Sequence, residues 1–540
     1  MMLPFELDAS AEQSLAFLTS QQRAQLTAAM TYHALINPSS ELEFIVSIGN
    51  LQQMPALTDR ATTGNEPLGD EVARVRVTSK ARGSAGDSGL VTRRIRLGHA
   101  AATPATTEPP ETPSLPHRLY RFLETRSPLL LDAAREFVMK RRSRATFEPL
   151  PRFPDGKRES GILDEMTQLS AFSTPAPGSQ PAVLFGLHWL QTGGAERWAI
   201  ESIRIARDSG LLPIIVTDKN SVHPWITRPE LDGCIVITMS FSDHQHPLDL
   251  PLAQALLNNF DIRGIVLHHS QWLYDSLPWI KAQRPDVPVI DSLHIVEYLR
   301  GGYPGSSVHF DDYIDLHHVI SPQLVEWMSQ VQGVDARKLV LAPLGALTVN
   351  ESQQFKARDP HRPFTVAFIG RLSRQKRPDL FIALVHRLRK QGLRFHAILQ
   401  GDGELRNVVQ RLIDRFGLED VIEQRFEDTP VSQTLAETDL LVITSINEGL
   451  TLTTFEAVAA GVPVISTDVG SQYTLIDGGM LLPRAARKFL PAAVKRITML
   501  FTDEAHRASA WREQRRRTQD FAAHPDAHTY FERLFAQWQE

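Results

Sequence analysis

Residues 439–467 read DLLVITSINEGLTLTTFEAVAAGVPVIST, and this stretch decides the fold. It contains two short apolar runs, at 439–445 and 462–467, which have the composition of buried strands. Between them, 451–460 has the composition of a helix. Short apolar strands that alternate with helices are typical of a parallel sheet with both faces covered. The stretch therefore predicts an α/β domain.

The same alternation continues in both directions along the chain. Apolar runs such as AVLFGL, GIVLHH and FTVAFIG are separated by helical segments, and the polar segment 347–363 divides the series in two. We expect an α/β protein with two Rossmann-like, doubly wound domains that face a cleft, at 181–346 and 364–500, joined by the linker 347–363 and followed by helices at 501–540. Ligands bind beyond the carboxyl ends of such strands, so the cleft is the expected active site.

The first third of the chain has a different composition. We expect a helical segment at 1–55, a linker or disordered stretch at 56–116 that is rich in Ser, Thr, Pro and Gly, and a helical and Pro-rich segment at 117–180. Within the last of these, 117–144 mixes large apolar residues with many arginines. Two interpretations stay open: a helical hairpin docked on the main body, or an amphipathic segment in peripheral contact with anionic lipid.

Charge and cysteine content limit the classes of function. A net charge of -5 gives no general attraction to nucleic acid, so no such partner is expected. The single cysteine, Cys234, excludes an intramolecular disulfide and fits a reducing cytoplasm. The amino terminus lacks the pattern of a secretory signal, and no window approaches ~18 consecutive apolar residues. We expect a cytoplasmic location, soluble or peripheral at the inner face of the membrane.

Basic residues follow the first strand of the second domain. Arg371 comes directly after Gly370, and Lys376 follows in the same loop. A planar guanidinium and a compact ammonium on neighbouring oxygens suit a diphosphate, although an ordinary basic surface loop has the same composition. After the next strand, the glycines of GDGE (401–404) open a tight turn or leave room for a flat ligand.

Two glutamates flank the predicted start of the helix at 451–460. Glu448 precedes Gly449, Leu450 and Thr451, whose backbone N–H groups form an anion site at the helix N-terminus. Glu456 lies inside the helix among apolar or small residues, where a charge is costly unless it binds something. The alternatives are an acid favoured by the helix dipole for the first glutamate and a carboxylate satisfied by a nearby donor for the second.

These segments carry a family resemblance. FIGRLSRQKRP (368–378), LQGDGE (399–404) and the run from TSINEG to STDVGS (444–471) resemble the carboxyl-terminal domain of the retaining glycosyltransferases of family 4, also called group 1, which have the GT-B fold. HWLQTGGAER (188–197) and DSLHIVEY (291–298) resemble, more loosely, the family's glycine loop and the strand end that carries a histidine. The resemblance covers roughly 182–500 and leaves the first third of the chain unassigned.

The resemblance implies a role for each matching residue. Arg371 and Lys376 would hold the nucleotide diphosphate, while Glu448 would face the donor sugar and Glu456 would accept hydrogen bonds from the ribose hydroxyls. His294 would contact the donor sugar near the reacting centre. The remaining implied site residues are the donor-binding Gly449, Leu450 and Thr451 and the glycine-loop residues Gly193 and Gly194, which would approach donor phosphate or acceptor.

Other features of the implied site leave alternatives open. His268 and His269 lie at another strand end and are alternatives to His294; three histidines in a cleft also suggest a metal, but no Asp or Glu stands at ligand spacing beside them. We expect neither metal nor cofactor, because two cations and a helix N-terminus already serve the leaving diphosphate. The run Val469–Thr474 lacks the family's second glycine and following glutamate, and Leu450 stands where a smaller residue is common.

The implied function is transfer of a sugar from a nucleotide-sugar to a glycan, a lipid-linked or another acceptor, in polysaccharide or glycoconjugate biosynthesis. The 364–500 segment would be the nucleotide-sugar-binding domain, and 181–346 would lie on the acceptor side. The alternatives are another GT-B enzyme, such as a nucleotide-sugar epimerase, and a non-catalytic scaffold with a transferase-like body.

Overall fold

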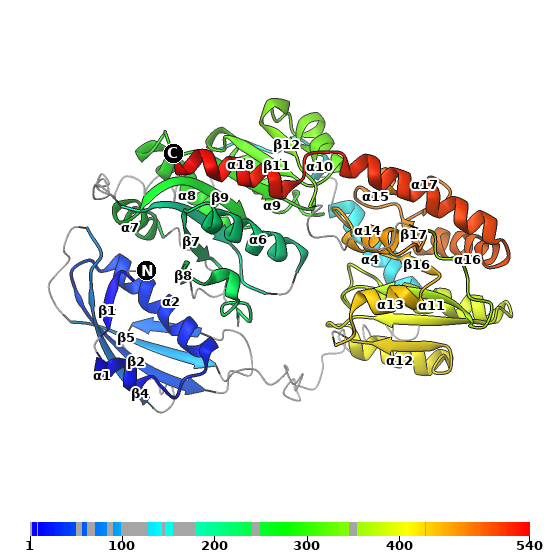
Figure 1. Ribbon diagram of the computed structural model, residues 1–540, viewed down its shortest axis with the longest axis horizontal. Coiled ribbons are helices and arrows are strands. Elements are labelled where there is room, and N and C mark those ends of the chain that lie inside the picture. Colours follow the sequence, from blue (N-terminus) through cyan, green and yellow to red (C-terminus); the bar gives the residue numbers. More distant parts are fainter. Residues whose placement is uncertain are drawn as a thin grey trace.

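The protein has two Rossmann-like α/β domains side by side and a smaller α/β module at its amino-terminal end (Figure 1). The computed structural model describes residues 3–7, 9–49, 57–61, 71–83, 90–98, 128–142, 146–154, 179–191, 193–219, 221, 223–239, 249–344, 354–426 and 428–540. The predicted architecture of two Rossmann-like domains is confirmed.

The amino-terminal Rossmann-like domain is built on a seven-stranded parallel sheet in the order β12-β11-β10-β9-β6-β7-β8. Its central strands are almost wholly buried, because helices cover both faces. The strands are β6 (Pro181–Leu187), β7 (Leu212–Thr217), β8 (Ile235–Thr238), β9 (Asp261–His268), β10 (Val289–Leu293), β11 (Leu316–Val319) and β12 (Leu339–Leu341). The helices are α6 (Gly194–Asp208), α7 (Leu250–Asn259), α8 (Gln271–Gln283), α9 (Tyr303–His309) and α10 (Pro322–Glu326), the last continuing as a π-helix over Trp327–Val331.

The carboxyl-terminal domain has a six-stranded parallel sheet in the order β15-β14-β13-β16-β17-β18. Its strands are β13 (Phe364–Ile369), β14 (Phe395–Gln400), β15 (Ile422–Arg425), β16 (Leu440–Ile443), β17 (Val464–Thr467) and β18 (Leu481–Leu482). Its helices are α11 (Pro378–Lys390), α12 (Arg406–Phe416), α13 (Val431–Glu437), α14 (Leu452–Ala459), α15 (Gln472–Leu475), α16 (Ala486–Thr502) and α17 (Glu504–Ala522).

The last helix, α18 (Ala527–Gln539), leaves this domain and returns to the other one. It packs along α6, and the Trp538 ring fills the space that a Cβ on Gly264 would need, 2.2 Å away. The chain therefore crosses between the domains twice, and its final residues form part of the core of the amino-terminal domain.

The amino-terminal module corrects the expectations for 1–55 and 56–116. It contains a five-stranded mixed sheet in the order β1-β4-β2-β5-β3, so the expected linker holds three strands and the expected helical segment holds two. Apart from 57–61, 71–83 and 90–98, residues 56–116 lie outside the described residues. The elements are β1 (Phe5–Leu7), α1 (Ala9–Ser14), α2 (Ser20–Ile36), β2 (Glu41–Gly49), β3 (Leu57–Ala61), β4 (Glu71–Ser79) and β5 (Val91–Gly98).

The strands of this module carry a signal that the bulk composition concealed. In β4, the buried Ala73, Val75 and Val77 alternate with the outward-facing Arg74 and Arg76. Alternation with period two is the pattern of a half-buried strand, and averaging composition over the whole segment removes it. Helix α2 covers the apolar face of this sheet. It also lies against β8, the edge strand of the seven-stranded sheet.

Helix α4 (Pro128–Arg142) docks on the carboxyl-terminal domain. Its buried Asp132 lies 3.3 Å from the guanidinium of Arg377, and Glu136 lies 3.2 Å from Arg484. The docking of this one helix agrees with the first interpretation of 117–144, while the expected hairpin stays a prediction. The other parts of 117–180, apart from 146–154 and 179–180, lie outside the described residues. In the described parts of the chain, no helix has both the length and the apolarity needed to cross a membrane.

A buried charged cluster joins β10, β11 and the turn before β11. His317 is fully buried, with Nδ1 2.9 Å from Asp291 and Nε2 3.0 Å from Asp311. Burial opposes the positive charge, but the two carboxylates outweigh it and raise the pKa of His317 from 6.5 to about 9. The histidine is therefore a cation in the folded protein at neutral pH.

Stability is expected to fall as the pH rises from 6.5 through about 9, because there the folded protein binds a proton at His317 that the unfolded chain releases. The difference corresponds to at most ~3 kcal/mol. Melting temperatures of wild type and His317→Gln, measured at both ends of this range, check it. Between these two pH values, the melting temperature of wild type should fall more than that of the variant. An equal fall would show that His317 is not the group responsible.

Candidate functional site

The two Rossmann-like domains touch where β10 of one and β16 of the other end. The position that a Cβ would take on Gly449 lies 1.7 Å from the carbonyl oxygen of His294, so a larger residue does not fit. Beside this contact, the Asn447 side-chain amide donates to the carbonyl of Val296 at 3.0 Å. Two residues that the sequence singled out separately, Gly449 and His294, are therefore neighbours across the domain interface.

Lys376 and Glu448 form an ion pair directly beside this interface. Nζ lies 2.6 Å from Oε1, and the glutamate side chain is only 7% exposed against 26% for the lysine. The lysine loop is fixed by the next residue, the buried Arg377, which has a left-handed φ of 51° and donates to the carbonyls of Thr444 and Ser445. The structure thus brings together the predicted diphosphate cation and the predicted sugar-facing carboxylate.

The N-terminus of α14 has no side-chain cap. Thr451 occupies the N-cap position, but its hydroxyl makes no cap hydrogen bond and is buried without a partner among the described residues. Uncapped N–H groups and the helix dipole favour an anion here. Across the cleft, the Cβ position of Gly194 lies 4.0 Å from Leu452, so the glycine loop faces the start of this helix. Leu450 is partly buried against the apolar cores of both domains.

Glu456 faces the same cleft from the middle of α14. Burial raises the pKa of its carboxyl, and Arg197 of α6, on the other domain, opposes this shift. Within the part of the chain that the structure describes, the carboxylate has no hydrogen-bond partner. The two glutamates therefore differ in their surroundings. Glu448 is paired with Lys376, whereas the Glu456 carboxylate is able to accept hydrogen bonds from a ligand.

Arg371 lies exposed at the end of β13, next to the glycine turn that follows β14. Gly401, with a φ of +142°, comes so close that a Cβ would lie 2.1 Å from the carbonyl oxygen of Gly370. The two predicted loops, GR at 370–371 and GDG at 401–403, are thus packed together on the side of β13 away from β16.

Gly193 has a structural reason to be glycine that the sequence did not reveal. Its Cβ would lie 1.9 Å from a carboxylate oxygen of Glu196. That carboxylate lies 3.0 Å from His188 Nε2 and accepts a hydrogen bond of 2.8 Å from the Trp189 indole. Burial opposes the charge of Glu196, but these partners hold its pKa at about 2. A close approach of Gly193 to a ligand stays a prediction.

The His188–Glu196 pair is the part of the site that sequence reasoning missed. Both residues lie in the HWLQTGGAER segment, which drew attention only for its glycines. The usable signal was a histidine directly after a strand with a carboxylate at the first turn of the following helix. Nδ1 of His188 is buried without a partner among the described residues.

The strand-end histidines differ in their surroundings. His269 has a left-handed φ of 62°, stacks on Tyr303 with ring centroids 4.7 Å apart, and meets the ring of His294 edge-on at 5.3 Å. His268 turns away to Ser202, 2.9 Å from its Nε2. No group of three or more metal-ligating side chains occurs among the described residues.

His294 is buried at the centre of the domain interface. Burial, reinforced by the neighbouring His269 and His268, lowers its pKa well below the ordinary value. The imidazole is therefore neutral at physiological pH, and it acts as a hydrogen-bonding group rather than as a cation.

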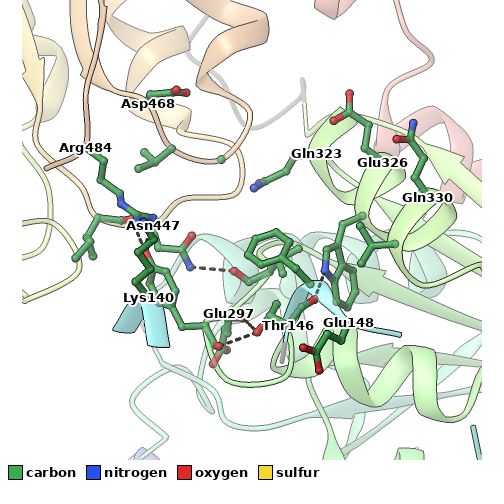
Figure 2. Close-up of a pocket in the computed structure, with 18 residues that line it drawn as sticks. Lys140, Thr146, Glu148, Glu297, Gln323, Glu326, Gln330, Asn447, Asp468 and Arg484 are labelled. Atoms are coloured by element: carbon green, nitrogen blue, oxygen red, sulfur yellow. Dashed lines mark hydrogen bonds between the residues drawn. The ribbon is translucent and has the colours of Figure 1, made fainter. Parts of the chain in front are cut away.

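A cavity of ≈ 760 Å³ opens between the domains (Figure 2). It lies near the Gly449–His294 contact, because Asn447 and Val296, each two residues from one of these partners, line it. Val296, Asn447 and Gly470 line it, whereas Glu448, Lys376 and the α14 N-terminus do not. The interface thus divides the cleft into a side with the predicted donor residues and a side with this cavity.

The chain is similar in sequence to known glycosyltransferases. Residues 349–513 match the sequence model of the family described as glycosyl transferases group 1. The chain is 28% identical over 173 residues to the GtfA subunit of a UDP-N-acetylglucosamine–peptide N-acetylglucosaminyltransferase of Streptococcus gordonii, covering 31% of this chain and 33% of that one. It is 27% identical over 192 residues to the putative colanic acid biosynthesis glycosyltransferase WcaL of Escherichia coli, covering 33% and 47%.

Among solved structures, the chain is similar to Anabaena HepE in complex with UDP, with a TM-score of 0.50 and 19% identity over 66% of this chain and 98% of that one. This likeness shows the fold, which is the two-domain GT-B architecture expected from the sequence. The chain spans about a third to a half of the length of the two curated relatives. These matches support a group 1 glycosyltransferase, with the family match confined to the carboxyl-terminal domain.

Proposed function

We propose that the protein is a glycosyltransferase of family 4 that moves a sugar from a nucleotide-sugar donor to an acceptor hydroxyl with retention of anomeric configuration. The observation that carries this proposal is the Lys376–Glu448 pair, 2.6 Å apart, placed directly beside the contact between Gly449 and His294. The pair lies in the loops that follow β13 and β16, and such folds bind their ligands beyond the carboxyl ends of their strands. UDP, the ligand of the HepE structure, is the nucleotide we assign to the donor.

Each predicted residue then has a task that its surroundings support. We place the diphosphate at the uncapped N-terminus of α14 beside Lys376, where negative charge grows as the sugar leaves, with Arg371 of the same β13–α11 loop as the second cation. The donor sugar lies against Glu448 and the neutral His294. Glu456, which has accepting capacity to spare, takes the ribose hydroxyls. Transfer without a metal is part of the proposal, because Lys376, Arg371 and the helix N-terminus supply the positive charge.

For the acceptor we propose a glycan or lipid-linked glycan, as in polysaccharide or glycoconjugate biosynthesis. WcaL is named for the synthesis of one such polymer. A location in the cytoplasm fits a nucleotide-sugar donor and the single buried Cys234.

Contact with the inner face of the membrane is the second part of the proposal, and the outer face of α4 supports it. Leu130 (68% exposed), Phe137 (70%) and Val138 (48%) share one helix face, since they are seven and eight positions apart. The acidic Asp132 and Glu136 face inward in ion pairs. The basic residues Lys140 and Arg141 are exposed at the end of the same helix. An apolar stripe beside basic side chains suits anionic lipid.

The donor site is tested by UDP binding and by transfer. Lys376→Ala should weaken UDP binding roughly tenfold or more, the value of one charge-assisted hydrogen bond. Glu448→Gln should keep UDP binding and lose transfer. Isothermal titration with UDP and chromatographic detection of product from UDP-sugars measure the two effects, and the anomeric configuration of the product is read by NMR.

Lys390→Ala is the matched control, because this exposed lysine lies at the far end of α11, the helix that begins just after Lys376. Melting temperatures check that each variant folds. Absence of UDP binding in wild type would refute the donor site. Interconversion of UDP-sugars without transfer would favour an epimerase, and UDP binding with neither activity would favour a scaffold.

The α4 stripe is tested by vesicle co-sedimentation. The combined change Leu130→Ser, Phe137→Ser and Val138→Ser should lower binding to phosphatidylcholine–phosphatidylglycerol vesicles by roughly tenfold or more, because three exposed apolar side chains are lost. Phe17→Ser, on an exposed phenylalanine of the amino-terminal module, is the control. Equal sedimentation of wild type, the triple variant and Phe17→Ser would reject this helix as the membrane contact. Equal sedimentation of wild type with anionic vesicles and with pure phosphatidylcholine vesicles would reject the preference for anionic lipid.

A further inference from the structure

The cavity on the far side of the Gly449–His294 contact has the size of a ligand site. Its volume of ≈ 760 Å³ lies within the range of pockets that enclose small molecules, and it sits between two domains, where such sites commonly occur. Figure 2 shows that its walls include the segment with Thr146 and Glu148, the loop with Glu297, the π-helical segment with Gln330, and the strand ends with Asn447 and Asp468.

One wall of the cavity is the π-helix Trp327–Val331, a rare conformation that is frequent at functional sites. Its Trp327 indole donates to the carbonyl of Thr146 at 2.8 Å, and Gln332, just beyond it, donates to the carbonyl of Glu148 at 3.1 Å. These bonds fix the segment Thr146–Glu148 against the π-helix. The Phe147 side chain is nevertheless 65% exposed, so the fold holds an aromatic ring out at the cavity wall.

The charged groups of the cavity are mainly carboxylates. Gln323 Oε1 is buried and has no partner among the described residues. Of the two cations in the lining, Arg484 is already used by Glu136 and the Tyr298 hydroxyl. The carboxylates that line the cavity outnumber the cations: Glu148, Glu297, Glu326 and Asp468 against Lys140 and Arg484.

This chemistry selects the class of ligand. Surplus carboxylates disfavour an anion such as a nucleotide or a phospholipid headgroup. A buried acceptor without a partner favours a ligand that donates, and an exposed aromatic ring favours one with an apolar face. A neutral sugar has both, because its hydroxyl groups donate and one face of its ring carries C–H groups.

We propose that this cavity binds neutral sugar units of the acceptor. The inference rests on the proposed glycosyl transfer and adds to it the place and the charge class of the acceptor. Hydroxyl groups donate to Gln323 Oε1 and to the carboxylates, while Phe147 packs against a sugar ring. Gly470 lines the cavity, and its would-be Cβ lies 2.3 Å from the backbone carbonyl of Glu448, so the bound sugars lie on the opposite side of the segment that carries the donor-side carboxylate.

The test is direct binding of neutral oligosaccharides, which requires no catalysis. Wild-type protein saturated with UDP is titrated with a panel of neutral tetrasaccharides of glucose, galactose and mannose, followed by saturation-transfer NMR and calorimetry. Phe147→Ala and Gln323→Ala should each weaken binding roughly fivefold or more, the value of one packing contact or hydrogen bond. Both changes spare the fold, because one side chain is exposed and the other has an unpartnered oxygen.

Phe17→Ala, on a phenylalanine that is 52% exposed and far from the cavity, is the matched control and should leave binding unchanged. The proposal is overturned if no member of the panel binds, if binding is the same in Phe147→Ala and Gln323→Ala as in wild type, or if tetragalacturonate or a basic peptide competes more strongly than the neutral sugars. Failure of UDP to bind would refute the donor site instead, and the oligosaccharide titration is then run without it.

Discussion

The close contact between Gly449 and the carbonyl of His294 is the constraint on which the cleft depends. It is made by backbone on both sides, so neither partner can yield by rotating a side chain. It sets the distance between the two sheets at the ends of β10 and β16. The position of Arg197 opposite Glu456 depends on this spacing, whereas Lys376 and Glu448 lie in the same domain and pair within it.

The contact also separates two chemistries. On one side are cations, an uncapped helix N-terminus and the two glutamates, which together suit a nucleotide diphosphate and its sugar. On the other side is the cavity with surplus acceptors and an exposed phenylalanine. Under the proposed function, a charged donor and a neutral acceptor would therefore bind in one cleft without competing for the same groups.

The sequence predicted the parts of the site that are local in the chain. Alternation of strand and helix gave the two domains, and the NEGLT segment gave the anion-favouring start of α14, because strand, loop and helix there are contiguous. It could not predict the direct pairing of Lys376 with Glu448 or the fit of Gly449 against His294, since these depend on how distant segments pack. His188 and Glu196 were missed although both lie in a quoted motif, because a hydrogen-bonded pair has no compositional signal.

The amino-terminal third shows the opposite failure. Its polar composition suggested a linker, yet β4 and β5 belong to a mixed sheet. In β4, outward-facing arginines alternate with buried apolar residues, so the average composition of the segment is polar. Segment 146–148 likewise has no motif, and only its bonds to Trp327 and Gln332 reveal that it forms a wall of the interdomain cavity. Such residues gain their role from tertiary contacts alone.

The most direct measurement of the central claim is small-angle X-ray scattering of Gly449→Ala. A methyl group cannot be placed 1.7 Å from the His294 carbonyl, so the domains are expected to separate and the distance distribution to widen. Gly478→Ala, at a glycine of the same domain with open space around its Cβ position, should scatter like wild type. A Gly449→Ala profile that matches wild type would contradict the claim that this contact sets the cleft.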